Sequence, residues 1–120
     1  MTWIRLAAGL GFLGVALGAF GAHGLRGKIP ESLLSAWQTG VLYHLIHAVA
    51  LLALALYARA QSVSVATPSA LFALGIALFS GSLYAMALTG VGRLGMITPL
   101  GGVAFLAGWV AVFATLGRPA

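Results

Sequence analysis

The spacing of the charged side chains limits the fold more than any other feature of the sequence. Only seven residues carry a formal charge, and the long uncharged stretches between them are Leu6–Leu25, Ser32–Ala58, Ala60–Gly92 and Leu94–Gly117. A helix needs about 20 mostly apolar residues to cross the hydrocarbon core of a bilayer, so each stretch is long enough for one. The sequence therefore predicts an all-α integral membrane bundle of four transmembrane helices.

Composition excludes most other classes of protein. Charged residues make up 6% of the chain, whereas soluble domains carry about 25%, so an ordinary water-soluble fold is excluded. The chain has no cysteine, which excludes a disulfide framework and cysteine-based metal sites. Glu31 is its single acidic residue, so chemistry that needs a pair of carboxylate side chains is excluded. We therefore expect no enzymatic activity, no catalytic residue and no cofactor.

The net charge of +5 comes from isolated basic residues at the ends of the apolar stretches. Nucleic-acid-binding proteins gather such residues into one patch, so we expect membrane lipids as partners and no nucleic acid. Four spans put both termini on one side of the membrane, and the basic residues then divide three against three, Arg5, Arg59 and Arg118 against Arg26, Lys28 and Arg93. Because the two sides carry equal numbers of basic residues, the positive-inside rule does not indicate an orientation. Usage rich in alanine, glycine and arginine suggests a bacterial source, and we expect both termini in the cytoplasm.

Helix starts are indicated where a threonine precedes a proline, at Thr67-Pro68 and at Thr98-Pro99. A threonine hydroxyl can cap a helix whose first residue is a proline. Together with the apolar stretches, these signals predict one domain over residues 1–120 with helices at Thr2–Ala22, Pro30–Ala58, Pro68–Leu88 and Pro99–Leu116. The joins between these helices are short and leave no room for a second domain.

The second predicted helix is longer than a membrane span requires. About 30 residues extend roughly 45 Å, whereas the hydrocarbon core is about 30 Å thick. The first part of this helix, Glu31–Thr39, is amphipathic, so we expect it to lie in the membrane interface as an extension that bends at Gly40. Trp37 and Trp3 then fit the aromatic belt at the interface.

Small residues recur at helical spacing and predict close helix contacts, because burial of apolar surface cannot drive association within lipid. The predicted small faces are Ala7, Gly11, Gly14, Gly18 and Ala22 in the first span, Ala70, Ala73, Ala77, Gly81 and Ala85 in the third, and Gly101, Ala104, Gly108 and Ala111 in the fourth. The alternative is that glycine is simply frequent in membrane helices.

Ionisable residues within spans tend to face the bundle interior. His44 and His47 lie one turn apart on the same face of the second helix as Tyr43, and His23 closes the first helix. His23 reaches the depth of His44 only if the second helix bends. These histidines are candidates for structural hydrogen bonds, for proton or small-solute transfer, or for binding a metal through neutral imidazole.

Two further groups of polar residues are candidate sites. Ser80, Ser82 and Tyr84 lie in the third span, where the serines can bond across to the second or fourth helix. Arg93 and Thr98 flank the start of the fourth helix and are candidates for contact with a lipid headgroup or an anion. The plainer interpretation of Thr98 is a helix cap.

Several short motifs occur in order, namely GAFGAHG at 18–24, QTG at 38–40, FSGSLY at 79–84 and TPLGG at 98–102. The ordered set resembles the "domain of unknown function 423" family of small membrane proteins, which includes the animal transmembrane protein 256. The resemblance implies a four-helix integral membrane protein, in bacteria a protein of the plasma membrane. It carries over no catalytic residue, since the family has no settled activity. The candidates that match its motif positions are His23, Tyr43, His47, Ser80, Ser82, Tyr84 and Thr98.

The sequence thus favours a non-enzymatic structural or accessory membrane component, either with a protein partner or as a homo-oligomer. Two alternatives remain open. One is a transporter of a small solute, proton or metal that uses the face of His44 and His47. The other is a lipid-binding membrane protein.

Overall fold

The computed structural model describes residues 2–117, which form helices joined by short turns. The elements are α1 (Trp3–Phe20), η1 (Gly21–Leu25), α2 (Glu31–Gln61), α3 (Ala66–Gly75), η2 (Ile76–Ser80), α4 (Gly81–Thr89), η3 (Gly92–Met96) and α5 (Thr98–Leu116). α1 runs directly into η1, and α3, η2 and α4 form one continuous rod. Four of the resulting helices are long and apolar enough to cross a membrane, Trp3–Leu25, Glu31–Gln61, Ala66–Thr89 and Gly92–Leu116. The four predicted spans are confirmed.

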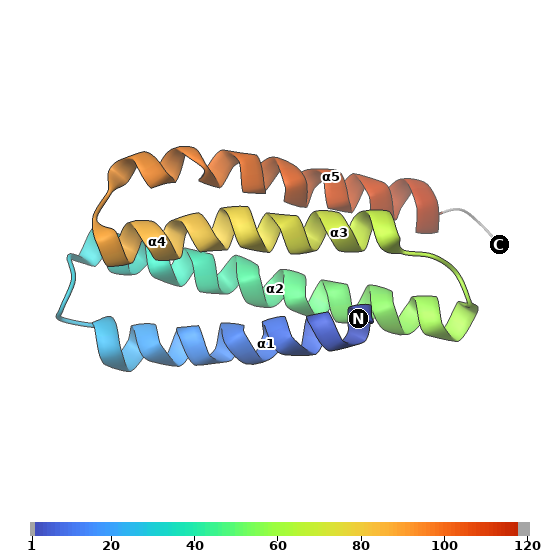
Figure 1. Ribbon diagram of the computed structural model, residues 1–120, viewed down its shortest axis with the longest axis horizontal. Coiled ribbons are helices and arrows are strands. Elements are labelled where there is room, and N and C mark those ends of the chain that lie inside the picture. The colour runs from blue at the N-terminus through green and yellow to red at the C-terminus, as the bar shows by residue number, and fades with distance from the viewer. Residues whose placement is uncertain (1, 118–120) are drawn as a thin grey trace.

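The spans pack side by side in the order of the chain (Figure 1). α1 contacts α2, α2 contacts the rod formed by α3, η2 and α4, and α5 packs on α3 and η2. The start of α1 and the end of α5 lie at the same end of the bundle (Figure 1). Arg118, which the sequence assigns to this end, lies outside the described residues.

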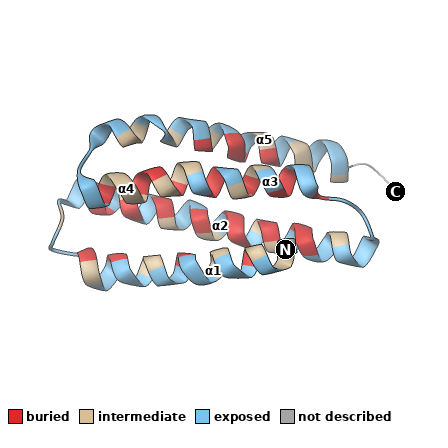
Figure 2. Cartoon of the chain, viewed as in Figure 1, coloured by how far each residue is buried: buried red, intermediate tan, exposed pale blue. Residues whose placement is uncertain are grey.

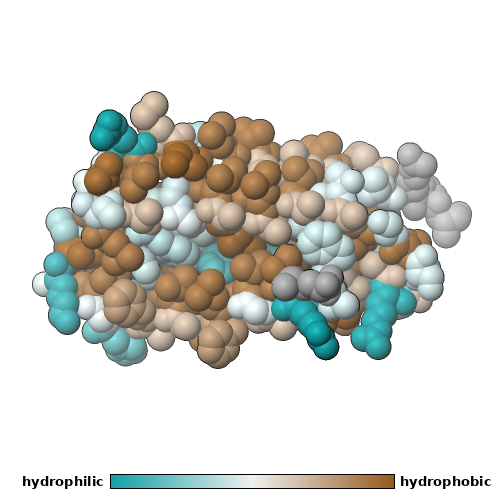
Figure 3. Space-filling view, viewed as in Figure 1, coloured by the Kyte–Doolittle hydropathy of each residue, from teal (hydrophilic) through white to brown (hydrophobic). Residues whose placement is uncertain are grey.

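The face of the bundle drawn in Figure 3 is mostly apolar along its middle and carries its most hydrophilic side chains toward its two ends. Large side chains on the outer helices are almost fully exposed, including Phe12 of α1 at 79% and Phe113 of α5 at 82%. Soluble proteins rarely expose apolar patches of this extent, whereas lipid chains cover them at no cost. Buried residues gather on α2 and on the neighbouring rod (Figure 2).

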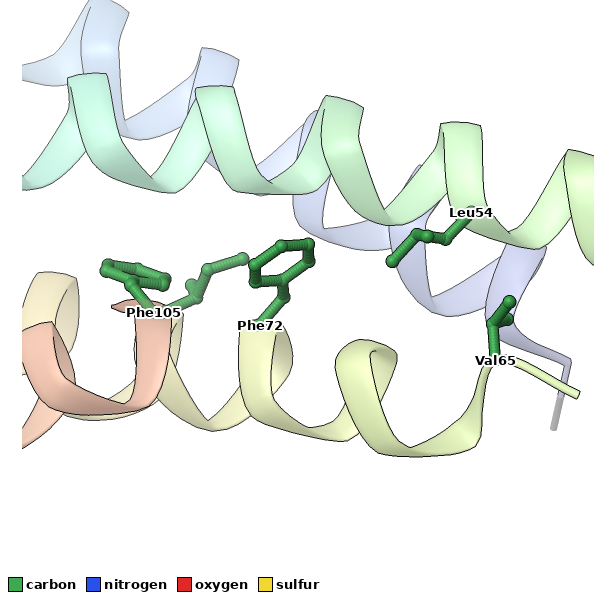
Figure 4. Packing of buried hydrophobic residues seen from close by; sticks show 5 residues of the cluster. Leu54, Val65, Phe72 and Phe105 are labelled. Carbon is green, nitrogen blue, oxygen red and sulfur yellow. The ribbon is translucent and has the colours of Figure 1, made fainter. Parts of the chain in front are cut away.

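The core consists of two apolar clusters at different levels of the bundle. The first joins Leu54, Val65, Phe72, Ile76 and Phe105 (Figure 4), and the second joins Leu25, Leu34, Trp37 and Ala87. Each cluster brings together residues from α2 and the third span, so these two elements form the centre of the molecule.

Glycines let the helices approach closely where the sequence predicts it in α1 and α5. A Cβ atom at Gly14 would lie 2.5 Å from Cδ2 of Leu45, and one at Gly108 would lie 2.6 Å from Cδ1 of Phe72. A Cβ at Gly101 would overlap the main chain of Phe79. The predicted small face of α5 is therefore confirmed, whereas that of α1 is confirmed only in part, because Gly11 has no neighbouring atom within 4 Å.

The predicted small face of the third span is wrong. Ala70 and Ala77 are exposed, and a Cβ at Gly81 would meet no atom within 4 Å. The buried face carries larger side chains, among them Phe72, and the partly buried Phe79 lies beside it. The glycine of this span that permits a close approach is Gly75, which lies outside the predicted positions and where a Cβ would overlap the ring of Phe105 in α5.

The predicted bend at Gly40 is also wrong, because α2 is one continuous helix of 31 residues. A Cβ at Gly40 would lie 3.0 Å from Cε1 of Tyr84, so glycine is needed there for packing. The amphipathic first turns of α2 lie at one end of the bundle, but their apolar side packs on protein. Trp37 is buried, not at the lipid interface, because its indole N–H donates to the carbonyl of Leu17 over 2.9 Å.

The two threonines expected to cap helices do not do so. α3 begins at Ala66 and α5 begins at Thr98, and neither helix has a side-chain cap. Thr67 and Thr98 therefore lie inside the first turns of their helices. The hydroxyl of Thr98 is used instead in a contact with Ser82, described below.

Candidate functional site

His44 is a buried link between three elements. Its side chain is 1% exposed, Nε2 lies 2.8 Å from the carbonyl oxygen of Leu10 in α1, and Nδ1 lies 2.8 Å from the hydroxyl of Tyr84 in α4. A carbonyl oxygen only accepts, so Nε2 carries the proton. In the neutral ring Nδ1 then accepts from the Tyr84 hydroxyl.

His47 forms a second link one turn further along α2. Its Nδ1 lies 2.8 Å from the carbonyl oxygen of Tyr43, and its Nε2 accepts the indole N–H of Trp109 in α5 over 3.0 Å. An indole nitrogen only donates, so Nε2 must carry a lone pair and Nδ1 must carry the proton. The imidazole also stacks on Phe105, with ring centroids 3.7 Å apart.

The partners of His47 require a neutral imidazole protonated on Nδ1, and a neutral His44 holds the opposite tautomer, protonated on Nε2. All four of their ring nitrogens are occupied by partners within the chain. A metal ion or other ligand at His47 would have to displace Trp109, and one at His44 would have to displace Tyr84 or break the bond to α1. Within residues 2–117, no group of three or more metal-ligating side chains is found.

The two serines of the third span bond across helices, as the sequence predicts. Ser80 donates to the carbonyl oxygen of Gly40 in α2 over 2.7 Å in a fully buried contact. Ser82 Oγ lies 2.6 Å from Oγ1 of Thr98 at the start of α5. With His44 and Tyr84, these bonds join every span to at least one neighbour through polar groups.

His23 does not join this network, so its assignment to the polar interior site is wrong. It lies exposed in η1 at the end of the first span. In the straight α2, Trp37 faces Gly21, and His44 lies seven residues, or about 10 Å, further along the helix. His23 and His44 therefore lie at different depths, as expected for an unbent second helix.

Tyr43 contributes its main chain to the network and its ring to a groove. Its ring packs on Phe79, with centroids 4.6 Å apart, and no described residue bonds its hydroxyl. The groove beside it has a volume of about 390 Å³ and reaches His47, and its other lining residues include Phe105, Leu106 and Trp109. The lining is mostly apolar, and the imidazole edge within it is already bonded to Trp109.

The two candidate headgroup residues, Arg93 and Thr98, have different surroundings. Thr98 is half-buried and its hydroxyl contacts Ser82, so the predicted headgroup contact at Thr98 is wrong. Arg93 lies exposed in η3 at the end of the bundle. Contact between Arg93 and lipid stays a prediction.

Sequence reasoning missed the role of Trp109. A signal was available, because an indole N–H in the middle of a span needs an acceptor. The imidazoles of α2 are the natural acceptors at that depth. The main-chain partners, Leu10 and Gly40, carry no such signal, because any residue provides a carbonyl oxygen.

Comparison with known proteins agrees with this architecture. The model of a family described as a protein of unknown function (DUF423) matches residues 17–102. The chain is 51% identical over 113 residues to the UPF0382 membrane protein YwdK of Bacillus subtilis, which covers 92% of each chain. It is 45% identical over 116 residues to a UPF0382 membrane protein of Staphylococcus epidermidis, covering 96% of this chain and 95% of the relative.

A third relative is the UPF0382 inner membrane protein YgdD of Escherichia coli. It is 48% identical over 105 residues, which cover 86% of this chain and 79% of the relative. No solved structure matches the chain. The family model and these relatives span most of the chain, and they confirm the resemblance indicated by the ordered motifs. The chain is a four-helix membrane protein that belongs to the DUF423 family of unknown function.

Proposed function

We propose that this protein is a non-enzymatic structural or accessory component of the membrane. The observation that carries the proposal is the complete internal bonding of His44 and His47. Each imidazole donates to a main-chain carbonyl and accepts from an aromatic side chain of another span. Buried polar groups that are satisfied in this way hold helices together.

A transporter is the weaker alternative. Transport sites need polar groups that face a cavity and can exchange partners. The groove at His47 is mostly apolar, and Trp109 covers the one imidazole nitrogen able to accept a proton or metal. A transport step at this site would need the half-exposed Trp109 to break its bond to His47 and move away from Phe72, whose ring centroid lies 4.8 Å from the indole.

The proposed setting is the plasma membrane of a bacterium, with both termini in the cytoplasm and no nucleic acid as partner. The E. coli relative is named an inner membrane protein, which supports a location in the plasma membrane. The exposed apolar faces of α1 and α5 are compatible with contact to lipid, to a protein partner or to a second copy. A lipid-binding role is considered separately below.

The experiment that tests the proposal compares stability with transport for His44→Gln and His47→Gln. We expect each variant to lower the thermal unfolding midpoint in detergent, because each removes at least one interhelical bond worth about 0.6–1.7 kcal/mol. His23→Gln is the matched control and should leave the midpoint unchanged, since His23 is exposed. In proteoliposomes we expect wild-type proton and divalent-metal flux at the level of empty liposomes. A wild-type flux that His47→Gln abolishes without loss of stability would overturn the proposal.

A further inference from the structure

Two arginines from different helices line one hollow at the end of the bundle that holds the start of α1. The hollow has a volume of about 670 Å³, and its lining residues are Thr2, Trp3, Ile4, Arg5, Ala55 and Arg59. We call it the arginine hollow. Arg5 lies in the first turn of α1 and Arg59 in the last turn of α2.

The hollow arises from the register between α1 and α2. The contacts of His44 with Leu10 and of Trp37 with Leu17 align the two helices antiparallel. Since α2 is longer, its last turns extend past the start of α1 (Figure 1). This overhang places Arg59 beyond the first turn of α1, and the small side chain of Ala55 leaves the space between them.

No acidic side chain is available to neutralise the arginine hollow. The only acid in the sequence, Glu31, is the first residue of α2, and it lies 28 residues, or about 42 Å, from Arg59. Two guanidinium groups beside one cavity repel each other until an anion lies between them. The positive charge of the hollow therefore favours an anionic ligand.

The position and the remaining lining residues indicate which anion. The hollow lies where two spans end, and arginine and tryptophan are enriched where membrane proteins meet lipid headgroups. Ile4 and Ala55 continue the lining with apolar side chains, which suits the glycerol end of acyl chains. Arginine binds phosphate through parallel N–H···O bonds.

We propose that the arginine hollow binds the phosphate of an anionic phospholipid between Arg5 and Arg59, beside Trp3. This assigns a ligand to the membrane-boundary end of the α1–α2 pair and goes beyond the proposed structural function. Free phosphate has the same chemistry toward the guanidinium groups, but it has no apolar part that contacts Ile4 and Ala55.

The test uses the purified full-length protein in mild detergent, titrated with phosphatidylglycerol and with phosphatidylcholine of the same chain length. We expect the wild type to bind phosphatidylglycerol roughly tenfold or more tightly than phosphatidylcholine, as a paired guanidinium site requires. The double variant R5Q/R59Q should lose this preference. The double variant R26Q/K28Q removes the same charge from the opposite end of the bundle and should keep it.

Three results would overturn the proposal. The first is equal binding of the two lipids by the wild type, a comparison that does not depend on whether R5Q/R59Q folds. The second is an equal loss of preference in both double variants, which would assign the effect to overall charge. The third is displacement of phosphatidylglycerol by inorganic phosphate in excess, which would make the hollow a site for a free anion. We expect inorganic phosphate to leave lipid binding unchanged.

Discussion

Trp109 of α5 donates its indole N–H to Nε2 of His47 in α2 over 3.0 Å. The bond determines which nitrogen of His47 carries the proton, and the protonated Nδ1 on the other side of the ring donates to the main-chain carbonyl of Tyr43. It also connects two spans whose positions in the chain are 62 residues apart.

Trp109→Phe should lower the stability of the bundle while keeping an aromatic ring against Phe72. The loss of one interhelical hydrogen bond predicts a decrease of about 0.6–1.7 kcal/mol in the free energy of unfolding. Unfolding in detergent with increasing sodium dodecyl sulfate measures this change. Nitrogen-15 spectra of labelled histidine should also show His47 leaving its single tautomer.

Trp3→Phe is the control for this change, because it also converts an indole to a phenyl ring. The Trp3 side chain is half-buried at the bundle end, and the structure gives its N–H no partner among the described residues. We expect its unfolding free energy to stay closer to that of the wild type. A Trp109→Phe variant as stable as the wild type would contradict the role of the bond.

Tyr84→Phe should destabilise the protein by leaving Nδ1 of His44 without a donor. A buried acceptor without its partner costs about 1–3 kcal/mol. Tyr43→Phe is the control, because it removes a tyrosine hydroxyl of α2 that no described residue bonds. The difference between the two unfolding midpoints measures the bond, and equal midpoints would show that the Tyr84 hydroxyl contributes nothing.

Gly101→Ala and Gly81→Ala separate close packing from mere glycine frequency. A methyl group at Gly101 would overlap the main chain of Phe79, which cannot move aside as a side chain can, so overpacking should cost about 1–3 kcal/mol. A methyl group at Gly81 meets no atom within 4 Å. Gly81→Ala should therefore be neutral or should stabilise the helix by up to about 1 kcal/mol.

The orientation in the membrane is tested by reporter fusions. We expect a fluorescent reporter that folds only in the cytoplasm to be active at both the N- and the C-terminus, because the two ends of the described chain lie at one end of the bundle (Figure 1). A periplasm-specific reporter inserted between Arg26 and Lys28 should be active in the same cells. Activity of that periplasmic reporter at either terminus would reverse the proposed orientation.

The architecture was predictable because it depends on quantities that lie along the chain. Seven charges and four uncharged stretches determine the number of spans without any knowledge of contacts. The small face of α5 was predictable too, since Gly101 and Gly108 repeat at helical spacing. The third span shows the limit, because Ala77 and Gly81 repeat in the same way yet face outward. Spacing identifies a small face but does not say whether a neighbouring helix needs it.

The polar network was predictable by residue type but not by pairing. His44, Tyr84 and Ser80 were expected inside, and they are linked there through α2 and the third span. Their partners depend on the register between helices, which follows from close contacts such as Trp37 with Leu17. A bend at Gly40 would have brought His23 to the depth of His44, but α2 is straight and His23 lies at the end of the first span.

The straight α2 has a consequence for how the protein is made. α2 bonds to α1 through His44, to the third span through Ser80, and to α5 through His47. α5 follows α2 in the chain, so Nε2 of His47 has no donor until Trp109 has been synthesised and inserted. The hydrogen bonds that join α2 to its three neighbours are therefore complete only once α5 is in place.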